Sequence, residues 1–401
     1  MANIQLPFTR RDKLGRYYTE LNVSDILVSQ MDSLGASSIL DLGSGSGNLS
    51  CAASLRWKTA TITTIDIESD IKNKFSSSNH ITADALNFNL PESLGINEST
   101  IDIALCNPPY IKPIWNEDYQ KLSEAIGIEK YTRISSILSS EVIFLAQTIR
   151  MLKYGGEAGV ILPDGIFSAQ RLSPLREYLI NEHEIKKIIQ LPRKTFKKTE
   201  AKTHIAIFNK NKKTNPTKKI ELYTINEENE LSEPIEISDL DGINRLDYSY
   251  YNNDKSSDGL KIGDIAIIKR GKHSSKEIRK LKLPTIHTTD LCGFDKNLCL
   301  PELNITQLKD NNKYTIACSG DILMSRVGRG FSEKIAFVNS GNAIVSDCIF
   351  IIRGNILDIK KIYDFLTSSD GQNELNRNSY GVGAAQISMD LLKKISIGIL
   401  P

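Results

Sequence analysis

Apolar and polar residues alternate in blocks along the first two hundred residues, and these blocks predict strands that take turns with helices. Short apolar runs end in glycine or an acid, as in "ASSILDLGSG", "TATITTID", "HITADAL", "STIDIALC" and "GEAGVILP". Between them lie segments such as "ISSILSSEVIFLAQTIRML", where apolar residues recur at helical spacing. We therefore expect an α/β fold built on a doubly wound parallel sheet.

The pattern changes after residue 211 and again at Gly259. The stretch "KNKKTNPTKK" and the charged residues after it are typical of a connector, which we place at residues 216–258. From Gly259 onwards, short apolar runs such as "GDIAIIKRG" and "NAIVSDCIFIIRG" are punctuated by glycines. The sequence thus predicts an α/β domain at residues 1–215 and a mixed, strand-rich α+β domain at residues 259–401.

The composition is that of a soluble protein with a core, since 40% of the 401 residues are hydrophobic and 24% are charged. The sequence has no apolar run long enough to span a membrane and no signal-peptide core at its amino end. We therefore expect a cytoplasmic protein without membrane contact. The six cysteines are scattered without a CxxC pair, and there are five histidines, so we expect neither a metal site nor a disulfide framework.

Positive charge is unevenly distributed although the formal net charge is only +2. Between Arg193 and Lys219, many lysines and arginines accompany a single acid, Glu200. The region after Gly259 also has a surplus of basic residues. Two interpretations stay open: a surface that binds a polyanion such as nucleic acid, or a solvated lysine-rich surface.

A glycine-rich turn follows the first predicted strand, in "LDLGSGSGNLS", where Asp41 precedes Gly43 and Gly45. Glycines allow a ligand to approach the backbone, and the next helix offers N–H groups at its amino end. Asp66 and Asp84 end the next two predicted strands. Any one acid could be a turn or capping residue, but three at successive strand ends predict a pocket for adenosine. The spacing does not distinguish a dinucleotide from S-adenosylmethionine.

The fourth predicted strand, "IDIALC", runs directly into Asn107, Pro108, Pro109 and Tyr110. Prolines stop the strand and stiffen the turn, because each lacks an N–H and fixes φ. The turn therefore presents a carboxamide, a carbonyl and a ring at the carboxyl edge of the sheet, where open α/β sheets bind ligands. Cys106 fits strand packing better than catalysis.

These motifs closely resemble those of the gamma-type N6-adenine DNA methyltransferases, whose catalytic motif is Asn-Pro-Pro-Tyr. "GRYYTELNVSDILV" is similar to the leading cofactor segment of that family, and "GVILPDGIFS" and "LPRKTFKKTEAKTHIAIF" resemble its later motifs. The resemblance covers nearly the whole chain and implies a Rossmann-like, S-adenosylmethionine-dependent methyltransferase domain. The implied reaction is methyl transfer to N6 of an adenine flipped out of double-stranded DNA.

The resemblance also implies a role for individual residues. The cofactor-binding positions that carry over are Tyr18, Thr19, Asp41, Gly43, Gly45, Asp66 and Asp84. Asn107, Pro108 and Tyr110 carry over as catalytic positions, with Tyr110 and Phe196 stacking on the target base. The family often has Thr-Pro where this chain has Thr19 and Glu20, which is a departure from the family's motif.

The carboxyl-terminal segments "GDILMSRVGRGFSEKIAFVN" and "YGVGAAQISMDLLKKISIGILP" resemble a single target-recognition domain of type I restriction specificity subunits. Lys272, Arg326, Arg329 and Arg377 are the candidate DNA contacts, either to bases or to phosphates. A surface ion pair is the alternative for each. The implied setting is a restriction-modification or phage-defence system with an endonuclease or specificity subunit as partner.

Two other functions stay open. A protein glutamine-N5 methyltransferase would use the same Asn-Pro-Pro-Tyr pocket, although the long region after Gly259 argues against it. A noncatalytic DNA-binding subunit could retain the fold, although the intact motif argues against that. We expect no fused endonuclease, because fewer than 20 residues precede the first cofactor motif, and the ending "ILP" fits either a compact enzyme or a truncated chain.

Overall fold

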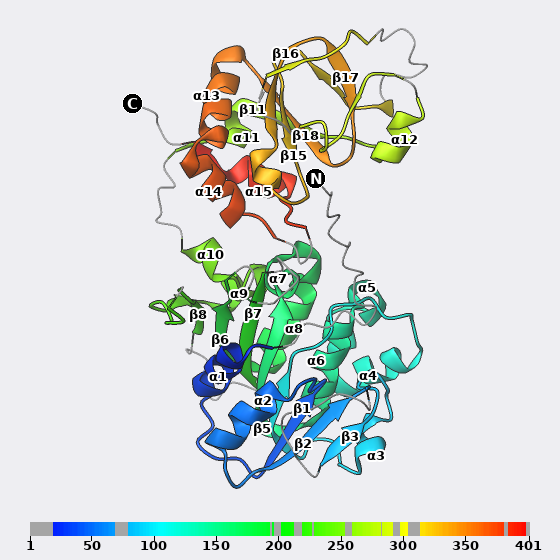
Figure 1. Ribbon diagram of the computed structural model, residues 1–401, viewed down its shortest axis with the longest axis vertical. Coiled ribbons are helices and arrows are strands. Elements are labelled where there is room, and N and C mark those ends of the chain that lie inside the picture. Colours follow the sequence, from blue (N-terminus) through cyan, green and yellow to red (C-terminus); the bar gives the residue numbers. More distant parts are fainter. Residues whose placement is uncertain are drawn as a thin grey trace, which may run out of the picture. The chain divides into compact units, whose positions relative to one another are not determined.

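The computed structural model describes residues 19–68, 79–192, 195, 202–211, 219–226, 228–252, 259–281, 283–291, 297–303, 313–380 and 384–397. The chain divides into two compact units, Met1–Tyr248 and Ser249–Pro401 (Figure 1). Each unit has its own hydrophobic core, and each is described by itself.

A nine-stranded sheet in the order β3-β2-β1-β4-β5-β7-β6-β8-β9 forms the centre of the first unit. Its strands are β1 (Ser38–Leu42), β2 (Thr61–Asp66), β3 (His80–Thr82), β4 (Ile101–Cys106), β5 (Leu152–Pro163), β6 (Glu184–Gln190), β7 (Thr203–Asn209), β8 (Ile220–Thr224) and β9 (Ile235–Ile237). β1 to β5 are parallel, and β7 lies antiparallel between β5 and β6. The strand order reverses between β1 and β4, which is the position where such sheets leave a crevice at the carboxyl ends.

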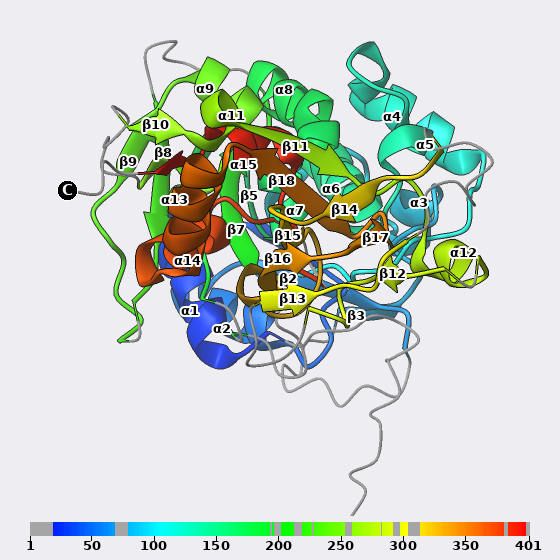
Figure 2. The same cartoon turned by 90° about the horizontal axis from the view of Figure 1, so that it is seen from above.

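Helices cover both faces of this sheet, which confirms the predicted α/β architecture (Figure 2). α1 (Leu21–Gln30) and α2 (Asn48–Arg56) pack on one face, and α6 (Ser140–Met151) and α8 (Ser173–Glu182) pack on the other. Strands covered on both faces must be apolar throughout, which explains runs such as "IDIALC". The sequence predicts one helix over "ISSILSSEVIFLAQTIRML", whereas the structure divides it into α5 (Ile134–Ile137) and α6.

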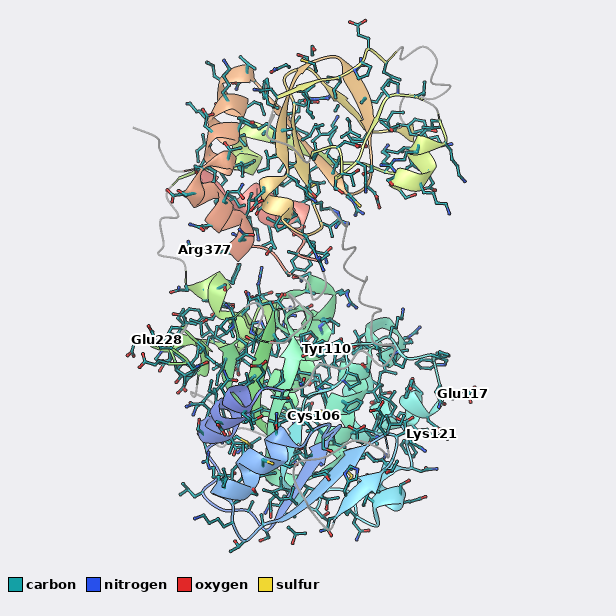
Figure 3. All side chains as sticks on the ribbon, viewed as in Figure 1. Cys106, Tyr110, Glu117, Lys121, Glu228 and Arg377 are labelled. Atoms are coloured by element: carbon teal, nitrogen blue, oxygen red, sulfur yellow. The ribbon has the colours of Figure 1, made fainter. Side chains whose placement is uncertain are left out.

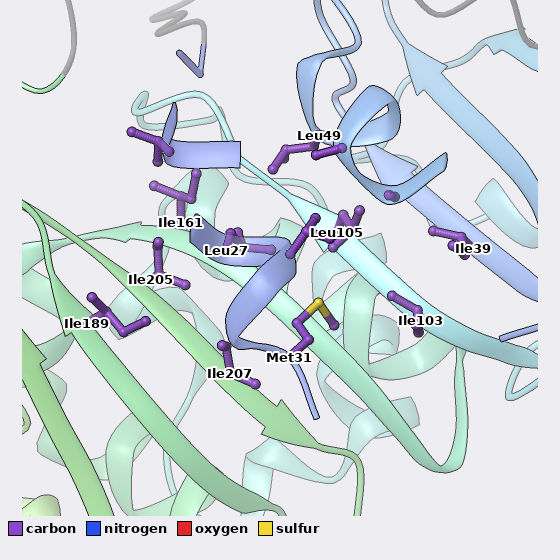
Figure 4. Close-up of a cluster of buried hydrophobic side chains, with 14 of the residues drawn as sticks. Leu27, Met31, Ile39, Leu49, Ile103, Leu105, Ile161, Ile189, Ile205 and Ile207 are labelled. Atoms are coloured by element: carbon purple, nitrogen blue, oxygen red, sulfur yellow. The ribbon is translucent and has the colours of Figure 1, made fainter. Parts of the chain in front are cut away.

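The core beneath α1 depends on a glycine of β5. Leu27 of α1 and Met31, the residue after α1, pack against a layer of isoleucines and leucines from the strands (Figure 4). A Cβ on Gly159 would lie 2.6 Å from Leu27 Cδ2 and 3.1 Å from the Met31 sulfur. Only glycine allows the helix to approach β5 this closely, and each buried Leu or Met contributes roughly 1.5–3 kcal/mol through burial.

The remaining helices of the first unit are short. They are α3 (Leu90–Leu94), α4 (Asp118–Ile126), η1 (Ile128–Lys130), α7 (Asp164–Ser168), η2 (Gln170–Leu172), α9 (Asp239–Asn244) and α10 (Tyr248–Tyr251), the last of which straddles the unit boundary. Among the residues that the structure describes, no helix has both the length and the apolar character needed to cross a membrane.

The segment predicted as a connector differs from that prediction, because part of it extends the sheet. β8 pairs with β6, and β9 pairs with β8. The buried guanidinium of Arg176 on α8 donates to the carbonyl oxygens of Ile243 and Asn244 at the end of α9. Edge strands are half exposed, so their mixed composition resembles that of a linker. In the structure, the first unit therefore continues to Tyr248.

The second unit is mixed and strand-rich, as predicted. Its five-stranded sheet has the order β11 (Ala266–Arg270), β18 (Ile349–Gly354), β15 (Ile322–Ser325), β16 (Ile335–Ser340) and β13 (Asn297–Cys299). A three-stranded sheet has the order β12 (Thr285–Ile286), β17 (Asn342–Val345) and β14 (Ile316–Cys318), and β10 (Leu260–Lys261) pairs with β19 (Ser396–Ile397). The helices are α11 (Ile262–Ile265), α12 (Ser275–Arg279), η5 (Phe331–Glu333), α13 (Ile356–Thr367), α14 (Ser369–Arg377) and α15 (Met389–Lys394).

Both faces of the five-stranded sheet are buried. Along β15, Ile322 and Met324 face one hydrophobic cluster, which they share with α13, α14 and α15. Leu323, between them, belongs to a second cluster shared with β17. Successive side chains of a strand point to opposite faces, so one short apolar run supplies both cores.

Candidate active site

A pocket of about 130 Å³ lies at the carboxyl ends of β1, β2, β3 and β4. Its walls include many of the residues that the sequence singles out. The described lining residues are Thr19, Gly43, Ser44, Gly45, Ser46, Asn48, Leu49, Asp66, Ile67, Ala83, Asp84, Ala85, Leu86, Asn107, Pro109, Ile111 and Phe144. The position matches the crevice expected where the strand order reverses.

The glycine-rich turn after β1 forms the floor of this pocket. Gly43 and Gly45 have φ angles of +71° and +50°, in the left-handed region that side chains disfavour. A Cβ on Gly43 would also lie 3.1 Å from a ring carbon of Phe144. The Gly45 N–H donates to Asp66 Oδ2 at 2.9 Å, so the turn is fastened to the end of β2. The structure thus brings together the glycines and the acid that the sequence predicts.

Asp66 and Asp84 both line the pocket, and each is oriented by its backbone surroundings. Asp66 Oδ1 accepts the Glu68 N–H at 3.0 Å, in addition to the bond from Gly45. Asp84 Oδ1 accepts the Leu86 N–H at 2.9 Å. A carboxylate oxygen has two lone pairs, so each group retains acceptor capacity for hydroxyl or amino hydrogens of a ligand.

Asp41, a predicted cofactor residue, is not among the described residues that line the pocket. Its carboxyl is fully buried, and Asp41 Oδ2 accepts a hydrogen bond from Ser50 Oγ of α2. Burial raises the pKa of Asp41 to about 7, against the opposing effect of the Ser50 hydrogen bonds. In this geometry the Asp41 carboxyl links the end of β1 to α2.

Asn107 projects from the end of β4 into the pocket, and Thr19 orients its carboxamide. Asn107 Nδ2 donates to Thr19 Oγ1 at 2.9 Å. Asn48 Nδ2 of α2 donates to the Thr19 carbonyl at 2.7 Å, which fixes Thr19 in turn. With its nitrogen directed at Thr19, the carboxamide of Asn107 presents its oxygen on the other side. The predicted contact at Thr19 is therefore between protein residues in this structure.

Ser140, at the first position of α6, holds the proline turn in place. Its hydroxyl donates to the Pro109 carbonyl and accepts the Ile111 N–H at 3.1 Å. Its own N–H donates to the Ile111 carbonyl at 3.0 Å. The side chain is fully buried, so these bonds are shielded from water. Sequence reasoning missed Ser140, because the residue lies far along the chain inside what reads as one continuous helix.

Pro108 is buried, and Tyr110 is half-buried just beyond the end of β4 (Figure 3). Neither is among the described residues that line the pocket. Cys106 is fully buried as the last residue of β4, and burial raises the pKa of its thiol well above the usual value. A thiol of that kind is not a nucleophile at neutral pH, which agrees with a packing role.

The pocket suits a ligand with an aromatic ring and several polar groups. Ile67, Leu86 and Phe144 supply apolar walls. Among the described residues that line the pocket, Ser44 Oγ and Asn48 Oδ1 are buried and have no hydrogen-bond partner in the protein. Buried polar atoms are rarely left unsatisfied, so a ligand that reaches them would be stabilised. S-adenosylmethionine has the adenine, ribose and amino acid groups that fit these walls.

Tyr18 and Phe196 lie outside the described residues, as does much of the basic run between residues 193 and 219. Phe144 was not predicted as a site residue, because its place in an apolar helical pattern made it look like ordinary core. Within the described part of the chain, no group of three or more histidine, cysteine or acidic side chains could hold a metal ion.

The four candidate DNA contacts of the second unit lie on different elements. Lys272, Arg329 and Arg377 are exposed, and Arg377 approaches Glu374 at 3.8 Å (Figure 3). Arg326 is half-buried, and its Nε donates to the Asp347 carbonyl at 3.3 Å. Arg270, which the sequence reasoning missed, donates to the same carbonyl at 2.9 Å, so the two guanidinium groups lie together.

Comparison with known proteins decides the family. The model of the N-6 DNA Methylase family matches residues 7–245, which is more than half of the chain. The chain belongs to this family. Its central sheet and flanking helices are those of the S-adenosylmethionine-dependent methyltransferase fold, and S-adenosylmethionine is the methyl donor that the family implies.

Curated relatives of this methylase-family chain are named as type II methyltransferases. Type II methyltransferase M.HincII of Haemophilus influenzae is 23% identical over 318 residues, which cover 77% of this chain and 58% of the relative. Type II methyltransferase M.PstI of Providencia stuartii is 28% identical over 211 residues, covering 47% and 40%. The chain thus spans less than two thirds of the length of these relatives.

One solved structure that the chain matches is that of the type IIG restriction endonuclease BpuSI. It shares 14% identity with this chain at a TM-score of 0.48, and the match covers 96% of this chain and 59% of that one.

Proposed function

We propose that this chain transfers a methyl group from S-adenosylmethionine to N6 of adenine in double-stranded DNA. The observation that carries the proposal is the Asn107 carboxamide, held by Thr19 at the rim of a pocket whose residues suit an adenosine ligand. Membership in the N-6 DNA methylase family supports both the reaction and the substrate.

The reaction requires two hydrogen-bond acceptors at the amino nitrogen of the target base. That nitrogen is a poor nucleophile, because its lone pair is delocalised into the base. Asn107 Oδ1 and the Pro108 carbonyl, each accepting one N–H, would favour a pyramidal nitrogen with its lone pair directed at the methyl group. They would also stabilise the positive charge that develops there. The bound donor would supply an electrophilic methyl group: the N–C bond forms as the C–S bond breaks, S-adenosylhomocysteine leaves, and the substituted nitrogen gives up one proton to solvent. The protein contributes positioning and electrostatics.

We assign the cofactor residues from the geometry of the pocket. Asp66 would accept hydrogen bonds from the ribose hydroxyls, and Asp84 would accept one from the adenine amino group. Ile67, Leu86 and Phe144 enclose the rings. The residues that line the pocket and the hydrogen bonds that orient Asp66 and Asp84 support these assignments. Tyr110 and Phe196 are the proposed stacking partners of the flipped base, and Tyr18 remains a proposed cofactor residue.

The second unit is the proposed target-recognition domain. Its paired guanidinium groups, Arg270 and Arg326, are held by one carbonyl and would suit guanine edges or phosphates. With Lys272, Arg329 and Arg377 they form the proposed DNA-contacting set. Adenine specificity, a place in a restriction-modification system and a nuclease or specificity partner all belong to this proposal.

The test is transfer of labelled methyl from S-adenosylmethionine to unmethylated genomic DNA, with the product nucleoside identified. We expect N6-methyladenine from the wild type and a loss of at least about 100-fold in Asn107→Ala, since removing one such oriented group typically costs that much. Asn97→Ala, an exposed asparagine in the loop before β4, should behave as wild type. Label in protein or RNA but not in DNA would overturn the proposal, and so would full activity in Asn107→Ala.

A further inference from the structure

Two large apolar side chains are exposed just after the proline turn. Ile114 is 91% exposed and Trp115 is 45% exposed. They lie between Tyr110 and the start of α4, and we call them the Ile114–Trp115 tip. Isolated exposed hydrophobic residues are common, but a tryptophan beside a second large apolar residue, next to a proposed catalytic turn, is the kind of patch that marks a binding surface.

The tip adjoins the proposed active site through shared walls. A shallow hollow is lined by Ile114, Trp115 and Tyr119 together with Leu86 and Ile111. Leu86 and Ile111 also line the pocket at the strand ends. A macromolecule whose reacting group reaches Asn107, at the rim of that pocket, would therefore come to lie against the tip.

The segment that carries the tip is held at both ends. Ile111 is bonded through its N–H and its carbonyl to Ser140, as described above. At the other end, the Tyr119 N–H donates to the Asn116 carbonyl at 3.1 Å, and Asn116 Oδ1 accepts the Asp118 N–H. The Trp115 ring meets the buried Tyr119 ring edge-on at 6.2 Å. A tip fixed in this way loses little conformational entropy when it binds.

The charges around the tip favour bases over phosphates as its partner. Glu117 and Asp118 follow directly, and Lys121 is already paired with Asp118 at 2.7 Å (Figure 3). Lys112 is exposed just before the tip, so the two lysines and two acids beside it balance, and neither Ile nor Trp offers phosphates a positive charge. The faces of nucleic acid bases, in contrast, stack on apolar and aromatic side chains.

We propose that the Ile114–Trp115 tip contacts DNA bases next to the target adenine and fills or supports the stack that the flipped base leaves. This inference rests on the proposed function and adds a residue-level element to it. Apolar wedges of this kind are used where proteins unstack a duplex, and they compensate the cost of unstacking.

Tryptophan fluorescence tests the contact directly. The chain has two tryptophans, and Trp57 is 3% exposed with its ring nitrogen bonded to the Ser33 carbonyl at 3.1 Å. Iodide quenching of the full chain therefore reports mainly on Trp115, and Trp115→Phe supplies the background. We expect duplex DNA to shield Trp115 from iodide. Unchanged quenching in the DNA complex would overturn the proposal, as would shielding that depends on protein concentration and not on DNA.

Activity provides the second readout. We expect Ile114→Ser combined with Trp115→Ala to lower kcat/KM for DNA about 10- to 100-fold, the loss expected when unstacking is no longer compensated. Affinity for S-adenosylmethionine should be unchanged. Once the methylated position has been mapped, 2-aminopurine can replace the target adenine, because its fluorescence rises when it leaves the base stack. The double variant should give a smaller rise in fluorescence than the wild type.

The matched control is Leu34→Ser, because Leu34 is 98% exposed and precedes β1 at the opposite edge of the sheet. It should match the wild type in every assay. If the wild type methylates DNA and the double variant is equally active, the inference about the tip is wrong and the proposed function is unaffected. Absence of transfer to DNA by the wild type would instead sink the proposed function.

Discussion

Asn107 and Thr19 meet through a 2.9 Å hydrogen bond that runs from the carboxamide nitrogen to the threonine hydroxyl, which ties the residue after β4 to the segment just before α1. This contact selects one of the two orientations of the carboxamide. The orientation matters because only the oxygen can accept an N–H from a substrate amine.

Thr19→Val should therefore lower kcat with little effect on folding. Valine keeps the shape of threonine but removes the hydroxyl, so the carboxamide loses its orienting partner. A hydrogen bond of this kind contributes about 1 kcal/mol, which corresponds to a loss of about 5-fold. Steady-state kinetics should show that the loss is mainly in kcat. Thr19→Ser keeps the hydroxyl, so its kcat should be close to that of the wild type. A Thr19→Val enzyme with wild-type kcat would show that Asn107 is oriented without Thr19.

Ser140→Ala should loosen the proline turn that Ser140 holds through Pro109 and Ile111. We expect kcat to fall at least about 10-fold, because a small displacement of catalytic acceptors has large effects on rate. Ser123→Ala is the matched control, since Ser123 is equally buried but bonds only within its own helix, to the Gln120 carbonyl. Equal kinetics in the two variants would argue that the turn is rigid through its prolines alone.

The sequence could predict the parts of the site that follow strand ends. The residues concerned each lie at the end of a parallel strand or within three residues after it, and the carboxyl ends of such strands meet at one edge. They are Gly43, Gly45, Asp66, Asp84 and Asn107. That local rule brings them together without knowledge of the fold in detail. The same rule placed Asp41 in the pocket, but strand alternation turns its side chain toward α2.

Residues contributed from helices could not be found in this way. Ser140 and Phe144 reach the site from α6, and nothing in their spacing distinguishes them from packing residues. The segment containing β8 and β9 was read as a connector for a related reason. Strands at the outer end of a sheet share the polar composition of linkers, and only the pairing of β8 with β6 and of β9 with β8 reveals their role.

The buried carboxyl of Asp41 should make stability depend on pH. Burial raises its pKa to about 7, so the folded state holds this proton more tightly than the unfolded chain. The stability that this proton contributes is complete at low pH and is lost as the pH rises from about 4 through 7. Asp41→Asn should remove this loss and raise the melting temperature relative to wild type at pH 8. Asp25→Asn, at an exposed position of α1, should leave the pH profile unchanged. An Asp41→Asn profile parallel to wild type would contradict the argument.

A buried ionic cluster at the end of β5 should contribute stability that depends on pH in the opposite direction from that of Asp41. Asp164 lies 3.4 Å from Lys202 Nζ and 3.0 Å from His204 Nε2, and Lys202 also approaches Asp247 at 3.5 Å. Burial alone would raise the pKa of Asp164. The Lys202 charge and the His204 hydrogen bond outweigh it and hold the pKa well below its usual range.

A lowered pKa means that this stabilisation is present at neutral pH and is lost as the pH falls below about 4. Asp164→Asn should reduce the free energy of unfolding at pH 7 by about 3 kcal/mol or more, because the buried Lys202 then keeps Asp247 but loses Asp164 as a charged partner. Its unfolding free energy should then fall less steeply than that of the wild type between pH 5 and pH 3. Asp118→Asn breaks only the surface pair with Lys121 and should cost less than about 1 kcal/mol. Urea denaturation at both pH values measures these differences, and equal losses in the two variants would mean that the buried cluster does not stabilise the end of β5.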